Sequence, residues 1–156
     1  MKKKVICLFT FLFLTMIICG CFAAEDDRQL YTKNNQASTA EVLDPIDKAE
    51  RNCISKTADT YEMNVCSQRA QQSWEKDIQE TLAELKKFLN TEDYKKLQSS
   101  QTSWENYKNK NYNLIDSVVS YKHGTMYLNV REGWKTEIVK QRALILREYL
   151  NTLKED

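Results

Sequence analysis

The stretch Asn52–Cys66, NCISKTADTYEMNVC, decides the fold because it places two cysteines thirteen positions apart around a polar segment. In one straight helix, the Cα atoms of Cys53 and Cys66 would lie about 20 Å apart, whereas a disulfide spans roughly 7 Å at most. If the two thiols are joined, the chain must therefore reverse between them. Asp59, followed three residues later by Glu62, is a variant capping box and predicts that a helix begins after this turn.

The N-terminus indicates the compartment in which these cysteines work. Three lysines precede an apolar run from Val5 to Ile18, and small residues follow. This pattern predicts a secretory signal over residues 1–20, because the run is too short and wrongly flanked for a membrane-spanning helix. We therefore expect the mature chain to leave the reducing cytosol for the bacterial cell envelope or the medium.

Two cleavage sites fit the end of this signal. The residues Ile18–Cys21 resemble a bacterial lipobox, in which Cys21 becomes the lipidated first residue and anchors the chain to the membrane. An ordinary signal peptidase could instead cleave after Ala23, leaving a soluble periplasmic or secreted protein. We favour the lipobox. Residues 21–43 are polar and without periodicity, which predicts a flexible tether, and we place the folded domain at 44–156.

Only Cys53 and Cys66 remain in the mature domain, since the other cysteines lie in the signal or at position 21. An even pair in an oxidising compartment predicts a structural disulfide. A zinc site would need more ligands, and the chain has a single histidine, His123, far away in sequence. The spacing also differs from the Cys-x-x-Cys of redox pairs. We expect neither a metal nor another cofactor.

Composition restricts the class of fold and of partner. Three glycines and one proline give little turn material for a sheet protein. Removing the three lysines of the signal changes the formal charge from +1 to −2, which is no nucleic-acid-binding balance. We therefore expect a helical domain without nucleic-acid partners.

Asp44 and Pro45 predict an N-cap and a first-turn proline that open a short helix through Cys53. Three long helices follow, each recognised by a stripe at steps of three and four residues. The first stripe is Met63, Cys66, Ala70, Trp74, Ile78, Leu82, Leu85 and Leu89. The second, from Thr91 onward, is Leu97, Gln101, Trp104, Tyr107, Asn111, Ile115 and Val118. The third is Met126, Val130, Trp134, Ile138, Ile145, Tyr149 and Leu153, with Gln141 and Arg142 in its gap.

Short connections at Asn90–Thr91 and His123–Thr125 favour antiparallel neighbours. The prediction is an all-α fold: an antiparallel up-down-up bundle of three long helices, with the short N-terminal helix clipped on by the disulfide. The three tryptophans recur at intervals of thirty, one in each long helix. Aromatic residues in an apolar stripe usually lie in a core, so we expect all three to be buried.

The sequence shows no pattern typical of an enzyme, such as a Gly-rich phosphate loop, a nucleophile elbow or a His-Glu-x-x-His helix. One loop, Ser120–Thr125, stands out. Gly124 fits a left-handed helix C-cap and Thr125 fits the next N-cap. The same loop would project Tyr121, Lys122 and His123 from the end of the bundle, where they could contact an acidic partner.

Four motifs, in this order, resemble the LprI-type lysozyme-inhibitor domain over about Ile46 to Leu150. They are the cysteine pair enclosing Thr60, Glu62 and Met63; Gln101-x-x-Trp104-x-x-Tyr107-Lys108; Gly124-Thr125; and Lys140-x-Arg142-x-x-x-Leu146. Many members carry a second cysteine pair. In this chain, Tyr112 and the Trp134-Lys135 region stand in the places of those two cysteines. Gln79 and Leu82 also replace the Asn and Tyr that are common in the first long helix.

The resemblance implies a small helical envelope protein that inhibits a peptidoglycan-cleaving lysozyme by blocking its active-site cleft. A protein partner is thus expected, with lysozyme as the candidate. Fold and function separate readily, so a non-inhibitory interaction module or an immunity protein against a secreted toxin is the alternative.

Overall fold

A computed structural model describes residues 43–155, which form four helices and no strand. The helices are α2 (Pro45–Ile54), α3 (Thr60–Phe88), α4 (Thr91–Ser120) and α5 (Met126–Lys154). The prediction of an all-helical domain is confirmed. The expected signal, the expected lipidation site Cys21 and all of the expected tether except Leu43 lie outside the described residues.

Short polar side chains fix where three of these helices begin. The carboxylate of Asp44 accepts a hydrogen bond from the Ile46 amide at 2.9 Å, and Pro45 occupies the first turn as expected. The carboxylate of Asp59 accepts from the Glu62 amide at 3.0 Å. Asn90 caps α4 in the same way. Because these amides have no partner inside their own helix, each cap satisfies a donor that would otherwise depend on water.

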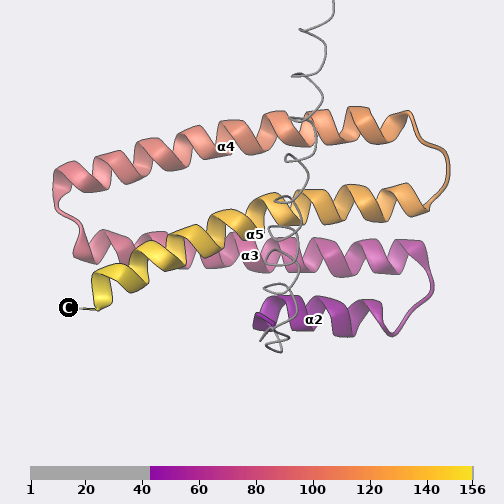
Figure 1. Ribbon diagram of the computed structural model, residues 1–156, viewed down its shortest axis with the longest axis horizontal. Coiled ribbons are helices and arrows are strands. Elements are labelled where there is room, and N and C mark those ends of the chain that lie inside the picture. The colour runs from indigo at the N-terminus through magenta and orange to yellow at the C-terminus, as the bar shows by residue number, and fades with distance from the viewer. Residues whose placement is uncertain (1–42, 156) are drawn as a thin grey trace, which may run out of the picture. The chain divides into compact units, whose positions relative to one another are not determined.

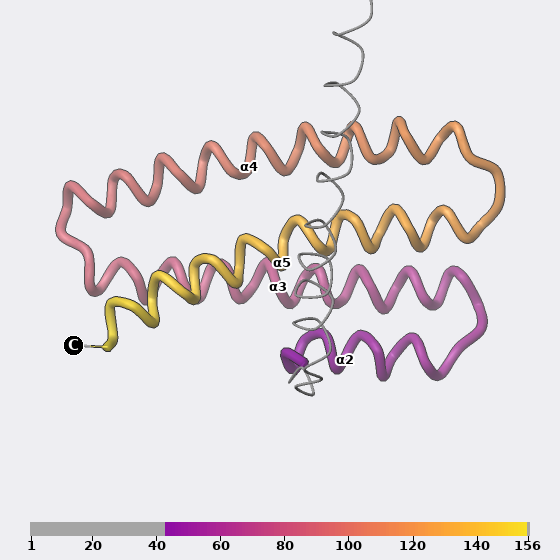
Figure 2. Tube along the Cα trace, in the orientation of Figure 1, coloured from indigo at the N-terminus to yellow at the C-terminus, as the bar shows by residue number. Residues whose placement is uncertain are grey.

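The long helices run back and forth beside one another (Figure 1). The chain turns at the end of α3 into α4, and α5 then returns between α4 and α3 before its C-terminal part crosses α3. The trace in Figure 2 shows α2 lying along the first part of α3. The most extensive packing joins α3 to α5, whereas α4 packs mainly against α5.

The seam between α3 and α5 has two unlike halves. The second half, formed by the later parts of both helices, holds the apolar core: Trp74, Ile78, Leu85, Val139, Ala143, Leu146 and Leu150. The first half, near the start of both helices, buries polar side chains instead: Asn64, Ser67, Glu132 and Thr136. The Thr136 hydroxyl donates to the Ser67 carbonyl at 3.3 Å across this part of the seam. The apolar driving force is therefore concentrated in one half.

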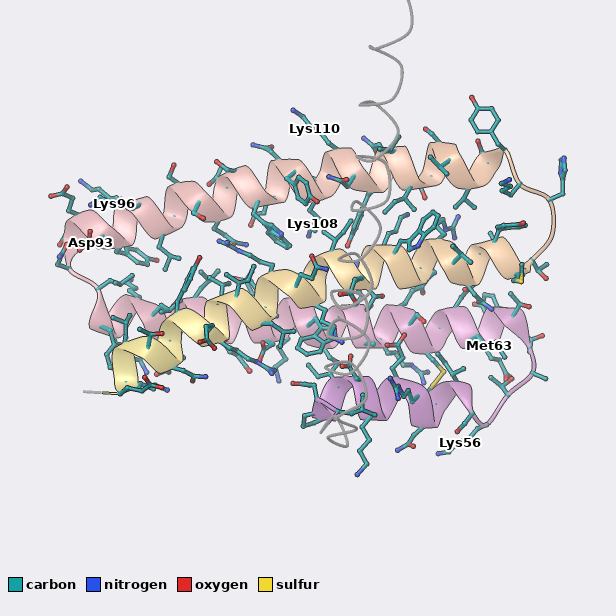
Figure 3. The ribbon with its side chains drawn as sticks, in the orientation of Figure 1. Lys56, Met63, Asp93, Lys96, Lys108 and Lys110 are labelled. Atoms are coloured by element: carbon teal, nitrogen blue, oxygen red, sulfur yellow. A yellow bond between two sulfur atoms is a disulfide. The ribbon has the colours of Figure 1, made fainter. Side chains whose placement is uncertain are left out.

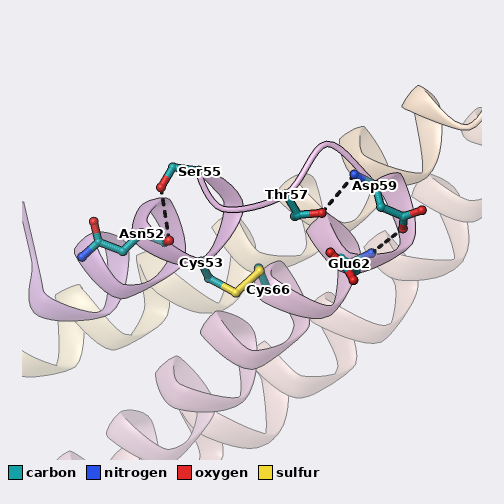
Figure 4. Close-up of a disulfide and its surroundings, with 7 residues drawn as sticks. All are labelled: Asn52, Cys53, Ser55, Thr57, Asp59, Glu62 and Cys66. Atoms are coloured by element: carbon teal, nitrogen blue, oxygen red, sulfur yellow. Dashed lines mark hydrogen bonds between the residues drawn. A yellow bond between two sulfur atoms is a disulfide. The ribbon is translucent and has the colours of Figure 1, made fainter.

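The disulfide joins α2 to α3 at the polar half (Figure 4). The Cα atoms of Cys53 and Cys66 lie 5.7 Å apart, because the chain reverses between them as the sequence predicted. Asp59 begins the returning helix, and its own amide donates to the Thr57 hydroxyl at 3.0 Å. The side chain of Glu62 makes no reciprocal bond to this amide, so the capping box is only half formed.

The stripe predicted for α3 is correct, and the one predicted for α5 is wrong. Cys66, Ala70, Trp74, Ile78 and Leu85 are all buried. On α5, by contrast, the predicted stripe is mostly exposed, and the neighbouring face is buried. The cause is that α5 carries apolar residues on two faces, so the three- and four-residue steps of the sequence fit either one. The buried alternative is Val139, Ala143, Leu146 and Leu150.

This error also corrects the expectation for the tryptophans. Trp74 is fully buried, Trp104 is partly buried, and Trp134 is 48% exposed on the outer face of α5. The α4 stripe is only partly covered as well, since Gln101 is buried but Tyr107 is 55% exposed. A helix that packs mainly against one neighbour cannot cover a wide stripe.

Candidate functional site

Two turns meet at one end of the domain, which we call the tip: residues 55–59 before α3 and residues 121–125 between α4 and α5. The Thr60 hydroxyl donates to the Thr125 hydroxyl at 3.4 Å, which places the two turns side by side. Figure 3 shows Lys56 and Met63 at this end and Asp93 at the opposite end. The tip is therefore built from segments that are distant in sequence.

The turn between α4 and α5 differs in detail from the prediction. Tyr121 caps α4, and the amide of Lys122 donates back to the Val119 carbonyl at 2.9 Å. The helix thus ends before Gly124, which is not its C-cap. Gly124 does have a positive φ of 105°, a conformation that favours glycine, and its carbonyl accepts from the Tyr127 amide at the start of α5.

Thr125 is also not the side-chain cap that the sequence suggested. Its hydroxyl makes no capping hydrogen bond, because its backbone is already helical, with φ −67° and ψ −24°. A capping side chain needs a residue whose backbone lies outside the helical region. The hydroxyl instead faces Thr60 of α3 and helps to join the two turns of the tip.

Large side chains at the tip are unusually open to solvent. Tyr121 is 83% exposed, Tyr61 at the start of α3 is 76% exposed, and Met126 at the start of α5 is 62% exposed. Lys122 and His123 are exposed beside them. The structure thus brings the predicted residues Tyr121, Lys122 and His123 to the same end as two residues that sequence reasoning missed.

The two residues were missed for different reasons. Met126 belongs to the stripe of α5 that the sequence predicts to be buried, so its exposure is part of the wrong prediction for that helix. Tyr61 lies directly after Thr60 and off the buried stripe of α3, and this spacing alone was a usable signal. Exposed tyrosines next to a cation are typical of protein-binding surfaces, because an aromatic ring offers a large contact area with few rotatable bonds.

A second candidate surface is an open groove between α3 and α4, of about 300 Å³. An ion pair crosses this groove: the Lys108 ammonium lies 3.3 Å from the Glu75 carboxylate. The same ammonium lies 5.2 Å from the ring centre of Trp104. Gln79, at which this chain departs from the resembled pattern, lines the groove. Leu82, the other departure, lines a neighbouring hollow of about 210 Å³.

The motif residues of α4 and α5 meet inside the domain and hold the two helices together. The Arg142 guanidinium donates from Nε to the Gln101 side-chain oxygen at 3.1 Å, and its carbon lies 5.9 Å from the ring centre of Trp104. Burial lowers the pKa of Arg142. Because these groups already bind one another, they carry structure and leave little free for a partner.

Arg147, on the other side of α5, also holds helices together. It donates twice to the Asp77 carboxylate of α3, at 2.8 Å each, and once to Asp44 at 2.6 Å. The hydrogen bonds to Asp77 raise the pKa of Arg147 the most. One side chain therefore ties the start of α2 to both α3 and α5, and the bidentate geometry fixes their register.

Two classes of site are absent from the described part of the chain. Within residues 43–155, no three side chains of the metal-binding types cluster together. The same residues contain no helix that is long and apolar enough to cross a membrane.

Comparison of the sequence with models of known protein families identifies a family for this chain. The profile of the lysozyme inhibitor LprI family matches residues 53–146, which include both turns of the tip and the internal Arg142 cluster. The chain belongs to the LprI lysozyme-inhibitor family. This is a family of inhibitors, which is compatible with a protein that binds another protein and is not itself an enzyme.

A solved structure shares the fold of this chain. The chain is similar to the crystal structure of an uncharacterized protein from Burkholderia thailandensis, with 26% identity and a TM-score of 0.67. The match covers 72% of this chain and 56% of that one, so the chain spans just over half the length of its structural relative. No curated protein matches the sequence.

Proposed function

We propose that the protein is a binding protein of the bacterial cell envelope that inhibits a peptidoglycan-cleaving lysozyme by inserting its tip into the active-site cleft. Membership of the LprI family supports the inhibitory role and a lysozyme partner. The exposed side chains support the tip as the binding site, because aromatic and basic groups are open to solvent together at this end of the domain.

The shape of the tip suits a cleft. The turn 121–125 lies at the end of two antiparallel helices, so it forms a narrow convex point. Its neighbour, turn 55–59, is held by the disulfide and by the Asp59 cap. A point held in advance loses little conformational entropy on binding, which favours affinity. Lys122 would face a catalytic carboxylate of the enzyme, and Tyr121 would supply the buried area.

The envelope location rests on the N-terminus. We propose that residues 1–20 are removed as a signal, that Cys21 carries a lipid anchor, and that residues 21–43 tether the domain 44–156 to the membrane. A lipid on Cys21 in the mass spectrum of the purified protein would support this anchor. An unmodified N-terminus at Ala24 would show that the protein is released by ordinary cleavage.

The tip is tested by replacing Lys122 and His123 together with alanine. Binding to lysozyme should weaken by about 2 kcal/mol or more, roughly thirtyfold, while the circular dichroism and the melting temperature change little. The matched control is Lys110→Ala with Asn113→Ala, at exposed positions of α4 outside the tip. If the tip variant inhibits lysis and captures lysozyme as well as the control, the tip is not the binding site.

A further inference from the structure

The wrongly predicted stripe of α5, apart from Met126 at the tip, forms a face that the described domain covers only in part: Val130 and Ile138 are half-buried, and α4 contacts it at Arg142. We call it the outer stripe: Val130, Trp134, Ile138, Ile145, Tyr149 and Leu153, with Gln141 and Arg142 at its centre. Trp134 is 48% exposed, Ile145 46%, Tyr149 52% and Leu153 37%. A row of half-open apolar side chains along one helix is a feature of interaction surfaces.

The order of residues in the outer stripe is symmetric about its centre. Counted along the chain, the steps are four, four, three, one, three, four and four residues. Each residue also has a chemical counterpart at the mirrored position: Val130 with Leu153, Trp134 with Tyr149, Ile138 with Ile145, and Gln141 with Arg142. A surface of this kind is complementary to itself when a second copy runs in the opposite direction.

We propose that two copies of this protein associate through their outer stripes, with the two α5 helices antiparallel and the twofold axis passing between Gln141 and Arg142. In this arrangement Trp134 of one copy packs on Tyr149 of the other, and Ile138 packs on Ile145. Isologous contacts of this type are the commonest way in which soluble proteins form dimers.

The centre of the stripe suits a twofold axis. Arg142 is buried and already bound to Gln101 and to the Ser100 hydroxyl, so it needs no partner from outside. Gln141 is exposed, and its amide carries both donors and acceptors. Two copies of this amide, one from each protein, can therefore pair across the axis. A single polar position in an apolar helical seam fixes the register of the pairing.

In the proposed dimer, exposed apolar residues of α4 extend the contact surface. Tyr107 and Leu114 follow Ser100 by one and two heptads, so they lie along the same side of α4 with little drift. That side is the one on which Ser100 accepts a hydrogen bond from Arg142, at the centre of the outer stripe. Tyr107 is 55% exposed and Leu114 60%.

The combined area is sufficient for a stable dimer. An aromatic side chain buries on the order of 150–250 Å², so Trp134, Tyr149 and Tyr107, each about half open, offer roughly 300 Å² together. The exposed parts of Leu114, Ile145 and Leu153, with Val118 and the polar rim, supply the rest of the roughly 800 Å² that each partner contributes. The outer stripe alone would fall short of this area.

Two other features agree with a second copy as the occupant. The chain's own segment before α2, residues 22–42, is dominated by polar residues such as EDDRQ and TKNNQAST, and so offers no matching apolar stripe. An antiparallel pair of α5 helices also points the two tips in opposite directions. Both tips thus remain open, and the dimer is compatible with the proposed inhibition.

Cross-linking in the full chain tests the pairing. Gln141→Cys, expressed with its own signal, should give a disulfide-linked dimer in envelope fractions on a non-reducing gel. The matched control is Ala83→Cys, an exposed position on α3, which packs against the opposite, buried face of α5. The control should stay monomeric, which also excludes mispairing with Cys53 or Cys66 as the cause of a dimer.

The register is tested in the Gln141→Cys background. Trp134→Lys alone and Tyr149→Glu alone should each lose the cross-linked dimer. Co-expression of the two variants should restore it as a mixed dimer, because the introduced lysine then meets the introduced glutamate, while the unchanged Tyr149 and Trp134 meet each other. Restoration also shows that both variants are folded.

Three outcomes would overturn the proposal. They are equal cross-linking of Gln141→Cys and Ala83→Cys, no restoration on co-expression of the two charged variants, and a Gln141→Cys adduct with a different protein in place of the dimer.

Discussion

The two halves of the seam between α3 and α5 are held by different means. The core half has Trp74, Leu146 and their neighbours in an apolar cluster, and needs no covalent link. The tip half buries Asn64, Ser67, Glu132 and Thr136, and is closed by the disulfide between α2 and α3. The Asn64 side-chain oxygen has no hydrogen-bond partner there. Polar burial of this kind contributes little net stability, so the bridge substitutes for apolar contact.

The difference bears on the proposed function. A partner surface of exposed tyrosines and a lysine must be held in one geometry to bind well, yet the residues beneath it supply little apolar packing. A disulfide can hold the tip in one geometry without further apolar residues being buried beneath it. We therefore read the core half as the source of stability and the tip half as a platform held by the bridge and caps.

The largest effect is expected where the core half is thinned. Leu146→Ala should lower the free energy of unfolding by about 2–5 kcal/mol, because the side chain is fully buried. The adjacent Ile145→Ala, on the outer stripe, should cost less than about 1 kcal/mol. Denaturant unfolding at sub-micromolar protein limits any contribution from a second copy. Equal losses would contradict the assignment of Leu146 to the buried face of α5 and Ile145 to the open one.

An intermediate effect is expected from opening the tip half. Replacing Cys53 and Cys66 together with alanine, so that no thiol is left, should cost about 3 kcal/mol. The loss should be local: amide hydrogen exchange should accelerate in α2 and at the start of α3, and much less around Val139 and Leu146. Uniform acceleration along α3 would contradict the division into two halves. A reduced but otherwise unchanged wild-type protein serves as the control.

The smallest effect concerns the contact of α4 with the tip half, and it depends on pH. Burial, with Glu75 and Glu132 nearby, raises the pKa of Tyr112 above its ordinary value of 10.0, and its hydroxyl donates to the Lys135 carbonyl at 3.2 Å. The folded protein thus holds this proton where the unfolded chain releases it. The stabilising contribution is complete below about pH 10 and is lost as the pH rises further.

Tyr112→Phe should therefore cost only about 1 kcal/mol at neutral pH, by loss of one hydrogen bond, and should make the fall in stability above pH 10 less steep. Urea unfolding at neutral and alkaline pH measures both effects. Tyr107→Phe, at a position that is 55% exposed, is the control. An unchanged alkaline slope in Tyr112→Phe would show that this phenol ionises equally in both states.

Much of the fold could be predicted from local signals. Asp44 and Asp59 are caps in the structure as in the sequence, because a short acidic side chain before a helix satisfies a free amide wherever it occurs. The reversal between Cys53 and Cys66 followed from the reach of a disulfide. The α3 stripe was also readable, since its large apolar residues fall on one face. Among the residues of the proposed site, Tyr121, Lys122 and His123 were placed by the sequence in the turn after a long helix, and they follow α4 in the structure.

The rest was decided by which helices meet. The sequence of α5 offers two faces that both satisfy helical periodicity, and only its packing against α3 selects Val139, Ala143 and Leu146 over Trp134, Ile145 and Tyr149. The same packing places Thr60 beside Thr125 and so adds Tyr61 and Met126 to the tip. Periodicity indicates that a face is apolar, but burial depends on a neighbour. The residues of α3 that α5 contacts are distant in the chain, as Ser67 is from Thr136, 69 positions away.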